Sequence, residues 1–322
     1  MTQAQAKYPI HVERVEFMSN GDRIVGDLFI PDTGGADTPG AALVVTGAWM
    51  TVKEQMPARY AREMASRGFL ALAFDFRGWG ESGGERRQFE SPAAKIADIE
   101  AAVAWLSARP EVDPSRIGGL GICASSGYMV HAAAETPSLA SIALVAPWLH
   151  DREIVEEIYG GADAVAGLEA KGDAAEAKYQ ADGLQTFALA ASLTDASSVM
   201  FKAPYYTEAD RGMIPEWRNE ADLGFWRGWL TFDAIKVASD LRQPFLMVES
   251  EAAAAPQGAH KFYAKLAGTK REVWLDGVTQ FDFYDQNKPV TAASDEAARH
   301  FRDTMDGQQA SGRASVSTTV DG

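Results

Sequence analysis

Apolar runs along the chain predict strands at regular intervals. Residues 11–18 and 22–30 are rich in β-forming types and are joined by Asn20-Gly21, a pair typical of tight hairpin turns. Short apolar runs predict six further strands, at residues 41–47, 69–74, 117–122, 141–146, 244–249 and 270–275. The pattern therefore predicts an antiparallel hairpin followed by a larger sheet.

Helical spacing fills most gaps between these strands. It predicts helices at residues 56–67, 92–107, 125–134, 257–266 and 290–305. The second helix has a typical cap residue, Ser91, followed by proline at its first position. A turn is expected at residues 113–115. Because strands that alternate with helices pair in parallel, we expect an α/β fold: a mostly parallel eight-stranded sheet with helices on both faces.

The alternation stops between residues 151 and 241, where no strand is expected. This segment is rich in alanine and glutamate and then in aromatic residues, among them Tyr206 and Trp229. Ligands of parallel α/β sheets bind outside the carboxyl ends of the strands, where an aromatic insertion would roof a mostly apolar pocket. We therefore expect a core of residues 1–150 and 242–306, a helical cap of residues 151–241, and a disordered tail of residues 307–322.

Composition narrows the classes of partner. The 322 residues include 30 Lys or Arg against 45 Asp or Glu, a formal net charge of −15 that repels phosphate backbones and argues against nucleic acid. The single cysteine, Cys123, excludes a disulfide within the chain and a multi-cysteine metal site. Without a signal-like N-terminus or an apolar run of membrane-spanning length, we expect a cytoplasmic protein with no membrane partner.

The strongest chemical signal is Gly121-Ile-Cys123-Ala-Ser125, which lies between a predicted strand and a predicted helix. The form G-x-nucleophile-x-small is typical of a nucleophile elbow, a turn so tight that the positions two before and two after the nucleophile must be small. Such a turn places Cys123 at the N-terminus of the next helix, where the helix dipole favours the thiolate. We expect Cys123 to be a nucleophile rather than an inert core residue.

With these residues the chain resembles the α/β-hydrolase superfamily, particularly its dienelactone-hydrolase-like branch, in which cysteine can serve as nucleophile. Supporting segments are residues 75–84 after the fourth strand, 112–117 before the elbow and 281–285 after the last strand. The resemblance implies the α/β-hydrolase fold with a helical cap. It also implies an oxyanion hole formed by the backbone N–H groups of Ala124 and Ala48, with Trp49 as a near alternative.

The acid and the histidine that this resemblance implies are missing. The acid is expected after the seventh strand, where Ala252 holds its place and Glu249 and Glu251 are imperfect substitutes. The histidine is expected after the last strand, where Gln280 holds its place. Glutamine cannot accept a proton at neutral pH, so it cannot act as a general base.

Three explanations of this departure stay open. Gln280 could be an introduced replacement of a histidine, although the simultaneous Ala252 argues against a single inactivating change. Alternatively, His150 after the sixth strand supplies the base, or it only caps a strand end. Finally, no base is needed if a thiolate attacks an activated acyl group or alkene, and the chemistry is then not hydrolysis.

The first functional hypothesis is a cysteine-dependent enzyme that acts on an ester, thioester or lactone of a small or medium apolar acid. In this hypothesis Cys123 attacks, Ala124 and Ala48 hold the oxyanion, His150 serves as base, and Gln280 orients substrate or water. The candidate substrate contacts are Trp49, Glu251, Tyr206 and Trp229.

Two alternatives come from the missing acid and base. One is a lyase, isomerase, cyclase or acyltransferase that uses the same thiol, and the other is a small-molecule-binding protein without catalysis. No spacing of His, Asp or Glu suggests a metal, and the glycines of residues 78–83 are a weak nucleotide signal, so we expect neither metal nor cofactor. The expected partner is a small-molecule substrate, and a homodimer is left open.

Overall fold

The computed structural model describes residues 7–34 and 38–306. The disordered tail predicted for residues 307–322 lies outside these ranges. Within the described ranges, no helix has the length and apolar character needed to cross a membrane.

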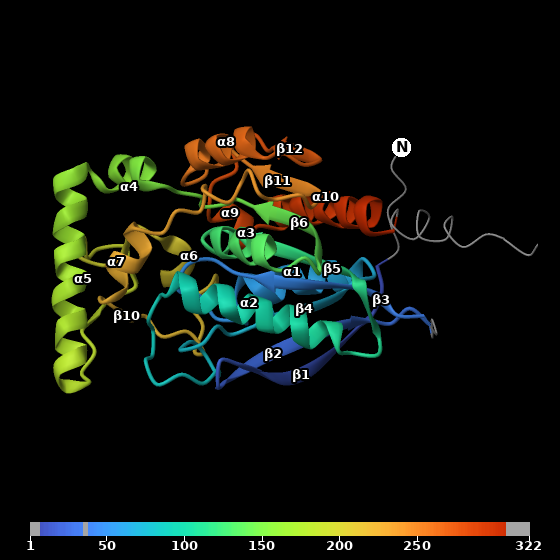
Figure 1. Ribbon diagram of the computed structural model, residues 1–322, viewed down its shortest axis with the longest axis horizontal. Coiled ribbons are helices and arrows are strands. Elements are labelled where there is room, and N and C mark those ends of the chain that lie inside the picture. The colour runs from blue at the N-terminus through green and yellow to red at the C-terminus, as the bar shows by residue number, and fades with distance from the viewer. Residues whose placement is uncertain (1–6, 35–37, 307–322) are drawn as a thin grey trace, which may run out of the picture.

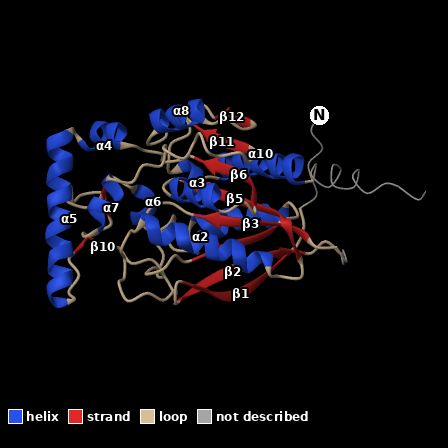
Figure 2. Cartoon of the chain, in the orientation of Figure 1, coloured by secondary structure: helices blue, strands red, loops and turns tan. Residues whose placement is uncertain are grey.

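An eight-stranded sheet forms the centre of the molecule (Figures 1 and 2). Its strands lie in the order β1-β2-β4-β3-β5-β6-β11-β12, and all neighbours are parallel except β1–β2 and β2–β4. Their bounds are β1 Ile10–Ser19, β2 Asp22–Pro31, β3 Gly40–Thr46, β4 Leu70–Phe74, β5 Val112–Ile122, β6 Leu139–Val145, β11 Phe245–Glu249 and β12 Lys270–Trp274. The predicted α/β fold with a mostly parallel eight-stranded sheet is confirmed.

Local sequence explains both the hairpin and the sheet interior. Asn20 and Gly21 connect β1 to β2 with φ angles of 47° and 92°, which asparagine and glycine tolerate best. Strands β4 and β11 are buried along their whole length, and β3 and β6 along nearly all of it, because helices cover both faces of the sheet. Strand β12 is at the edge and is partly exposed, which agrees with its charged residues.

One predicted turn lies inside a strand. Residues 113–115 belong to β5, but the pairing of β5 with β3 jumps from Gly40–Val112 to Ala42–Ile117. Within this irregular stretch, Asp113 Oδ1 accepts a hydrogen bond from the backbone N–H of Ser115 at 3.0 Å. The local turn is therefore real, and the strand continues through it as a bulge.

Helices cover both faces of the sheet. Helices α1 and α10 pack on one face, and α2 and α3 pack on the other (Figure 1). The predicted cap of α2 is confirmed, because Ser91 Oγ accepts from the N–H of Ala94 at 3.3 Å. The helices of the core are α1 Met56–Ser66, α2 Pro92–Ser107, α3 Ser125–Glu135, α8 Pro256–Lys265, α9 Asp282–Asp285 and α10 Asn287–Met305.

The cap segment, residues 151–241, lies beyond the carboxyl ends of the parallel strands. Its longest helix, α5, stands furthest from the sheet, and α6 and α7 lie between α5 and the core (Figure 1). Its elements are α4 Arg152–Tyr159, α5 Ala162–Asp182, β7 Phe187–Ala188, β8 Ala191–Ser192, β9 Met200–Phe201, α6 Pro204–Thr207, β10 Ala221–Asp222 and α7 Phe225–Leu230. The expectation of a segment without strands is wrong, since four two-residue strands form two small ladders, too short to leave an apolar pattern.

Candidate active site

Cys123 occupies a strained turn between β5 and α3. Its φ angle is +55°, a left-handed conformation that is uncommon for residues other than glycine. A Cβ atom at Gly121 would lie 3.0 Å from Ser126 Cα, so the residue two before Cys123 must be glycine or force a shift. The backbone of the predicted nucleophile elbow is therefore present.

The thiol faces an apolar cavity of about 280 Å³ under the cap segment. Aromatic and aliphatic side chains make up most of its lining, and no charged side chain is among the described residues around it. The lining residues are Trp49, Cys123, Ala124, Trp148, Ile158, Tyr159, Val199, Met200, Phe201, Ala203, Tyr206, Trp229, Ala254, Gln280, Phe281 and Tyr284. The structure thus brings together six of the nine residues predicted for the site.

Two backbone N–H groups lie beside the sulfur of Cys123. They belong to Ala124, at the start of α3, and to Trp49, in the loop after β3. The N–H of Ala48 instead donates to Met56 Sδ at 3.5 Å. The expectation for Ala48 is therefore corrected to its near alternative, Trp49, because the N–H of Ala48 is engaged by Met56 and that of Trp49 lies beside the sulfur.

Buried polar groups hold the loop that carries Trp49. The hydroxyl of Tyr206 donates to the carbonyl of Trp49 at 3.2 Å, and Trp217 Nε1 donates to the carbonyl of Met50 at 2.7 Å.

The N–H of Met50, a residue with φ +58°, donates to Glu90 Oε2 at 3.3 Å. Glu90 is fully buried and also accepts from Lys95 Nζ and from the hydroxyl of Tyr128. This network fixes the peptide between Trp49 and Met50, and Thr51 Oγ1 donates to the carbonyl of Ala48 at 2.7 Å, which holds the peptide that carries the Trp49 N–H.

His150 does not face Cys123 with a free nitrogen. Its Nδ1 accepts from Trp148 Nε1 at 3.0 Å, so its Nε2 carries the proton and donates to the carbonyl of Trp229 at 3.0 Å. Burial lowers the pKa of His150 to about 4, so the ring is neutral at pH 7. The interpretation of His150 as the general base is corrected, because both ring nitrogens are engaged: Nδ1 by Trp148 and Nε2 by Trp229 of the cap segment.

Gln280 is locked in one orientation at the place expected for histidine. Its Oε1 accepts from the N–H of Ala254 at 3.0 Å, and its Nε2 donates to the carbonyl of Ala146 at 3.0 Å. The same Nε2 donates to the hydroxyl of Tyr284 at 3.1 Å. Tyr284 in turn lines the same cavity as Cys123, and its hydroxyl is among the groups that lower the pKa of the thiol.

Tyr284 is the site residue that sequence reasoning missed. The sequence indicates segment 281–285 only as a feature of the resemblance and gives no role to its tyrosine. The available signal was spacing, since residues four apart share one face of a helical turn and Tyr284 follows Gln280 by four.

The loop after β11 places no carboxylate at the expected position. Ala252 is exposed, and its N–H donates to Ser250 Oγ. The side chain of Glu251 is 71% exposed and accepts from His260 Nε2, so Glu251 points away from the cavity. The prediction that Glu251 contacts the substrate is therefore corrected. Glu249 is 1% exposed, and its Oε2 has no partner among the described residues. Burial raises the pKa of Glu249 to about 8, so this carboxyl is mostly protonated at pH 7.

The thiol itself is neutral. Burial raises the pKa of Cys123 to about 11, although hydrogen bonds from Tyr284 and from the N–H groups of Ala124 and Trp49 oppose this shift. The expectation of a preformed thiolate at the helix N-terminus is therefore wrong, because the loss of water around the sulfur outweighs the local dipoles. A reaction at Cys123 must move the thiol proton during attack.

Trp49, Tyr206 and Trp229 meet over the cavity. The ring of Trp49 stacks on that of Trp229 with centroids 4.6 Å apart, and the hydroxyl of Tyr206 holds the Trp49 carbonyl. Trp229 Nε1 donates to the hydroxyl of Tyr159 at 2.9 Å. These polar contacts leave the ring faces to form the apolar wall, and substrate contact by the three residues stays a prediction.

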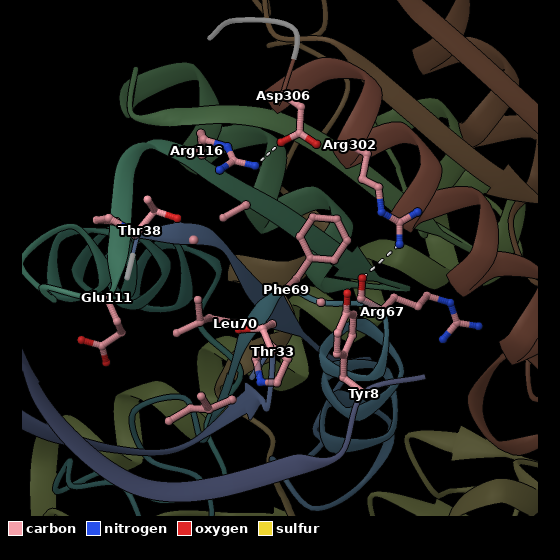
Figure 3. A pocket seen from close by; sticks show the side chains of 16 residues that line it. Tyr8, Thr33, Thr38, Arg67, Phe69, Leu70, Glu111, Arg116, Arg302 and Asp306 are labelled. Atoms are coloured by element: carbon pink, nitrogen blue, oxygen red, sulfur yellow. Dashed lines mark hydrogen bonds and ion pairs between the residues drawn. The ribbon is translucent and has the colours of Figure 1, made fainter. Parts of the chain in front are cut away.

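Two other features lie outside this site. A larger cavity, of about 520 Å³, opens where β3 and β4 begin, at the end of the strands opposite to Cys123. Figure 3 shows that Arg116 pairs with Asp306 there and that Arg302 donates to the carbonyl of Arg67. Three carboxylates, of Glu54, Asp75 and Glu81, lie close together, but Lys53 Nζ contacts all three. Cys123 belongs to neither feature.

Two bacterial proteins are similar to this chain over most of its length. PA2218 of Pseudomonas aeruginosa, an uncharacterized protein, is 30% identical over 278 residues, which are 83% of this chain and 74% of that protein. The uncharacterized protein YcjY of Escherichia coli strain K12 is 29% identical over 271 residues, 82% of this chain and 89% of that protein.

Solved structures give the same fold. The crystal structure of PA2218 matches with a TM-score of 0.81 and 25% identity over 94% of this chain and 98% of that chain. The α/β hydrolase GrgF of a Penicillium species matches with a TM-score of 0.76 and 21% identity over 92% of this chain and 99% of that chain. The α/β-hydrolase fold is thus confirmed, whereas the narrower dienelactone-hydrolase-like branch stays a prediction.

The family is given by a match that spans most of the chain. The model of the X-Pro dipeptidyl-peptidase (S15) family matches residues 20–279, from the hairpin turn to the residue before Gln280. The chain therefore belongs to the X-Pro dipeptidyl-peptidase (S15) family, a hydrolase family with the α/β-hydrolase fold.

Proposed function

We propose that this protein is a cysteine-dependent acyl-transfer enzyme, which takes the acyl group of an activated ester or thioester onto Cys123. The surroundings of Cys123 carry this proposal. A strained elbow presents the thiol to an apolar cavity, and the N–H groups of Ala124 and Trp49 lie beside it. Two such donors stabilise the negative oxygen that forms when a nucleophile attacks a carbonyl.

The proposed acylation balances without a cofactor. Cys123 Sγ attacks the carbonyl carbon and forms a C–S bond, and the carbonyl oxygen takes up negative charge beside the two N–H groups. The C=O bond then re-forms and the bond to the leaving oxygen or sulfur breaks. The thiol proton ends on the leaving alcohol or thiol, so the products are a neutral thioester and a neutral leaving group.

The same site disfavours hydrolysis of that thioester. Water and an acceptor alcohol or thiol must all lose a proton to attack, and the described lining of the cavity includes no His, Asp, Glu or Lys that would activate water in preference to the others. The apolar walls also retain an acceptor with an apolar body better than they retain water. We therefore propose transfer to an acceptor alcohol or thiol as the main outcome, with hydrolysis as a slow side reaction.

Esters and thioesters suit the site better than peptides do. When a thiol attacks an amide, the intermediate expels the thiolate more readily than the amine unless a strong acid protonates the nitrogen. No histidine among the cavity-lining residues supplies that proton. The proposed substrates are therefore esters and thioesters, whereas the family name, X-Pro dipeptidyl-peptidase, refers to peptides.

The cavity limits the size of the acyl group. Its volume of about 280 Å³ equals that of about nine molecules of liquid water at ~30 Å³ each. Its walls carry no charged side chain among the described residues, so a charged acyl group would lose hydration without compensation. We therefore propose a small or medium apolar acid as the acyl donor.

Intact-mass spectrometry with 4-nitrophenyl butyrate tests the proposed nucleophile. Cys123 is the only cysteine in the sequence, so a thiol adduct has one possible position. We expect one butyryl group on the wild type and none on Cys123→Ala, with the adduct on the peptide that contains residue 123. Equal turnover by Cys123→Ala would contradict the proposal, and so would tight binding of the ester with no adduct at any ester concentration.

A further inference from the structure

The hydroxyl of Tyr284 contacts the amide of Gln280 in the cavity that also holds the thiol of Cys123. Gln280 Nε2 donates to Tyr284 Oη at 3.1 Å, and Tyr284 lines the same cavity as Cys123. A hydroxyl that accepts one hydrogen bond keeps its own proton for another partner. The proton of Tyr284 is therefore available to the sulfur, or to an atom bound beside it.

Gln280 cannot reverse this arrangement by turning its amide. Its Oε1 accepts from the backbone N–H of Ala254, and the second hydrogen of Nε2 is donated to the backbone carbonyl of Ala146. A flip of the amide would face oxygen to oxygen at Ala146 and nitrogen to N–H at Ala254. Both backbone groups thus fix Gln280 as the donor and Tyr284 Oη as the acceptor.

We propose that Tyr284 is a catalytic residue that carries the proton between Cys123 and the leaving or acceptor group, at the place where a histidine is expected. This inference rests on the proposed acyl-transfer function and deepens it. Gln280 is a positioning residue, because it contacts Tyr284 and not the thiol.

The step is a double proton transfer with no net change in charge. As Sγ attacks the carbonyl carbon, the S–H proton passes to Tyr284 Oη, and the O–H proton of Tyr284 passes to the leaving oxygen or sulfur. Transfer to an acceptor alcohol or thiol reverses the relay: the acceptor proton passes to Tyr284 Oη, and the tyrosine proton passes to Sγ. Tyr284 is the same neutral phenol before and after each step.

The surroundings of Tyr284 favour a relay over a stored charge. Burial raises the pKa of Tyr284 well above its usual value, so a lasting phenolate is disfavoured. A relay without a stored charge accelerates steps in which one group loses a proton as another gains one. It gives little help to a leaving group that departs as a stable anion.

That last property supplies the test. The wild type, Tyr284→Phe and Tyr205→Phe are compared with two donors of the same acyl group, 4-nitrophenyl butyrate and S-butyryl-N-acetylcysteamine. Acylation of Cys123 is timed by rapid-quench mass spectrometry. Tyr205 is the matched control, because its ring packs edge-on against Tyr284 with centroids 5.1 Å apart and it does not line the cavity of Cys123.

We expect Tyr284→Phe to slow acylation by the alkyl thioester by about 10²–10⁴-fold, the usual contribution of general acid–base catalysis. Acylation by the nitrophenyl ester should slow at least tenfold less, because nitrophenolate departs without a proton. The small thiolate fraction of Cys123, whose proton has gone to solvent, can then react without the relay. Tyr205→Phe should change both rates less than twofold. A variant Gln280→Met should reproduce the dependence on the leaving group at smaller size.

Other results overturn the proposal. If Tyr284→Phe slows acylation equally with both donors, the hydroxyl is structural. If Tyr284→Phe does not fold, equal slowing of acylation with both donors in Gln280→Met leads to the same conclusion. Loss of acylation with both donors in Glu249→Gln, with Tyr284→Phe unaffected, would assign the proton to the buried carboxyl instead. Absence of any adduct on the wild type would refute the proposed function itself, which distinguishes the two failures.

Discussion

The two halves of the site are built on different principles. The loops after β3 and β5 supply Trp49, Cys123 and Ala124, and they act mainly through backbone geometry. The loops after β11 and β12 supply the backbone N–H of Ala254 and the side chain of Gln280. In this half, the chemistry of the glutamine amide decides which proton transfers can occur. The first half fits the pattern of the fold, whereas the second has an amide in place of a base. In the proposed function, a nucleophile and its donors are thus kept without the histidine and the acid that the resemblance implies.

The two halves are also held differently. The loop of Trp49 is fixed through Met50 to the buried pair of Glu90 and Lys95, whose charged atoms are 2.8 Å apart. Gln280 is held by neutral hydrogen bonds to the backbone of Ala146 and Ala254. Loss of a buried charge partner is the more damaging change, so we expect the nucleophile half to tolerate substitution less well.

The largest expected effect comes from Cys123→Ser. A serine hydroxyl holds its proton more tightly than a thiol does and is a weaker nucleophile, so the proposed relay through Tyr284 activates it less well. We expect the acylation rate with 4-nitrophenyl butyrate to fall by about 10²–10⁴-fold, the size of a general-base contribution, with an unchanged circular dichroism spectrum. A serine variant as active as the wild type would show that an unrecognised base operates in the site.

The next largest effect is expected from Gln280→His, which would give the second half the base that it lacks. A neutral imidazole at this place could accept a proton from water, so the butyryl group on Cys123 should be hydrolysed about 10²-fold faster than in the wild type. The control is Gln280→Met, which removes the amide and adds no base. Equal deacylation rates in the wild type and in Gln280→His would contradict this comparison.

Substitution of the buried ion pair tests how the nucleophile half is held. Glu90→Gln leaves Lys95 buried without its counter-charge, and we expect the free energy of unfolding in urea to fall by about 3–5 kcal/mol. Glu85→Gln, an exposed change in the same segment, should alter it by less than about 0.5 kcal/mol. A similar small change in both variants would show that the pair does not stabilise the loop.

The smallest effect concerns Glu249 and pH. Its pKa rises on folding from an ordinary value to about 8, because burial disfavours the charged form. The folded state therefore binds more protons than the unfolded state between these values, and stability must fall as pH rises toward 8. Each pH unit in this window contributes up to about 1.4 kcal/mol. We expect Glu249→Gln to flatten the decline measured by urea unfolding between pH 6 and 8, and an unchanged slope would contradict this assignment.

Much of the fold follows from local sequence. The hairpin at Asn20-Gly21, the cap of α2 at Ser91 and the buried strands are confirmed because each depends on nearby residues. The two-residue strands of the cap segment escaped prediction, since pairs such as Ala191–Ser192 are too short to have a period. The assignment of residues 151–241 as a separate cap domain and the open homodimer stay predictions.

The site was predictable only where the backbone defines it. The elbow at Cys123 and the place of Gln280 follow from spacing along the chain. The choice between Ala48 and Trp49 depended on where one loop turns, and the role of His150 depended on Trp148 and Trp229, contacts that form only in the folded protein. The raised pKa of Cys123 depends in the same way on burial under the cap segment.

The fate of the acyl group on Cys123 is the most direct test of acyl transfer against hydrolysis. The butyryl protein is prepared with 4-nitrophenyl butyrate, freed of excess ester, and followed by intact mass in buffer alone and with N-acetylcysteamine. We predict that the adduct persists in buffer and disappears with the thiol, as one equivalent of butyryl thioester forms. Loss of the adduct in buffer as fast as with the thiol, with release of butyrate, would contradict acyl transfer and identify a hydrolase.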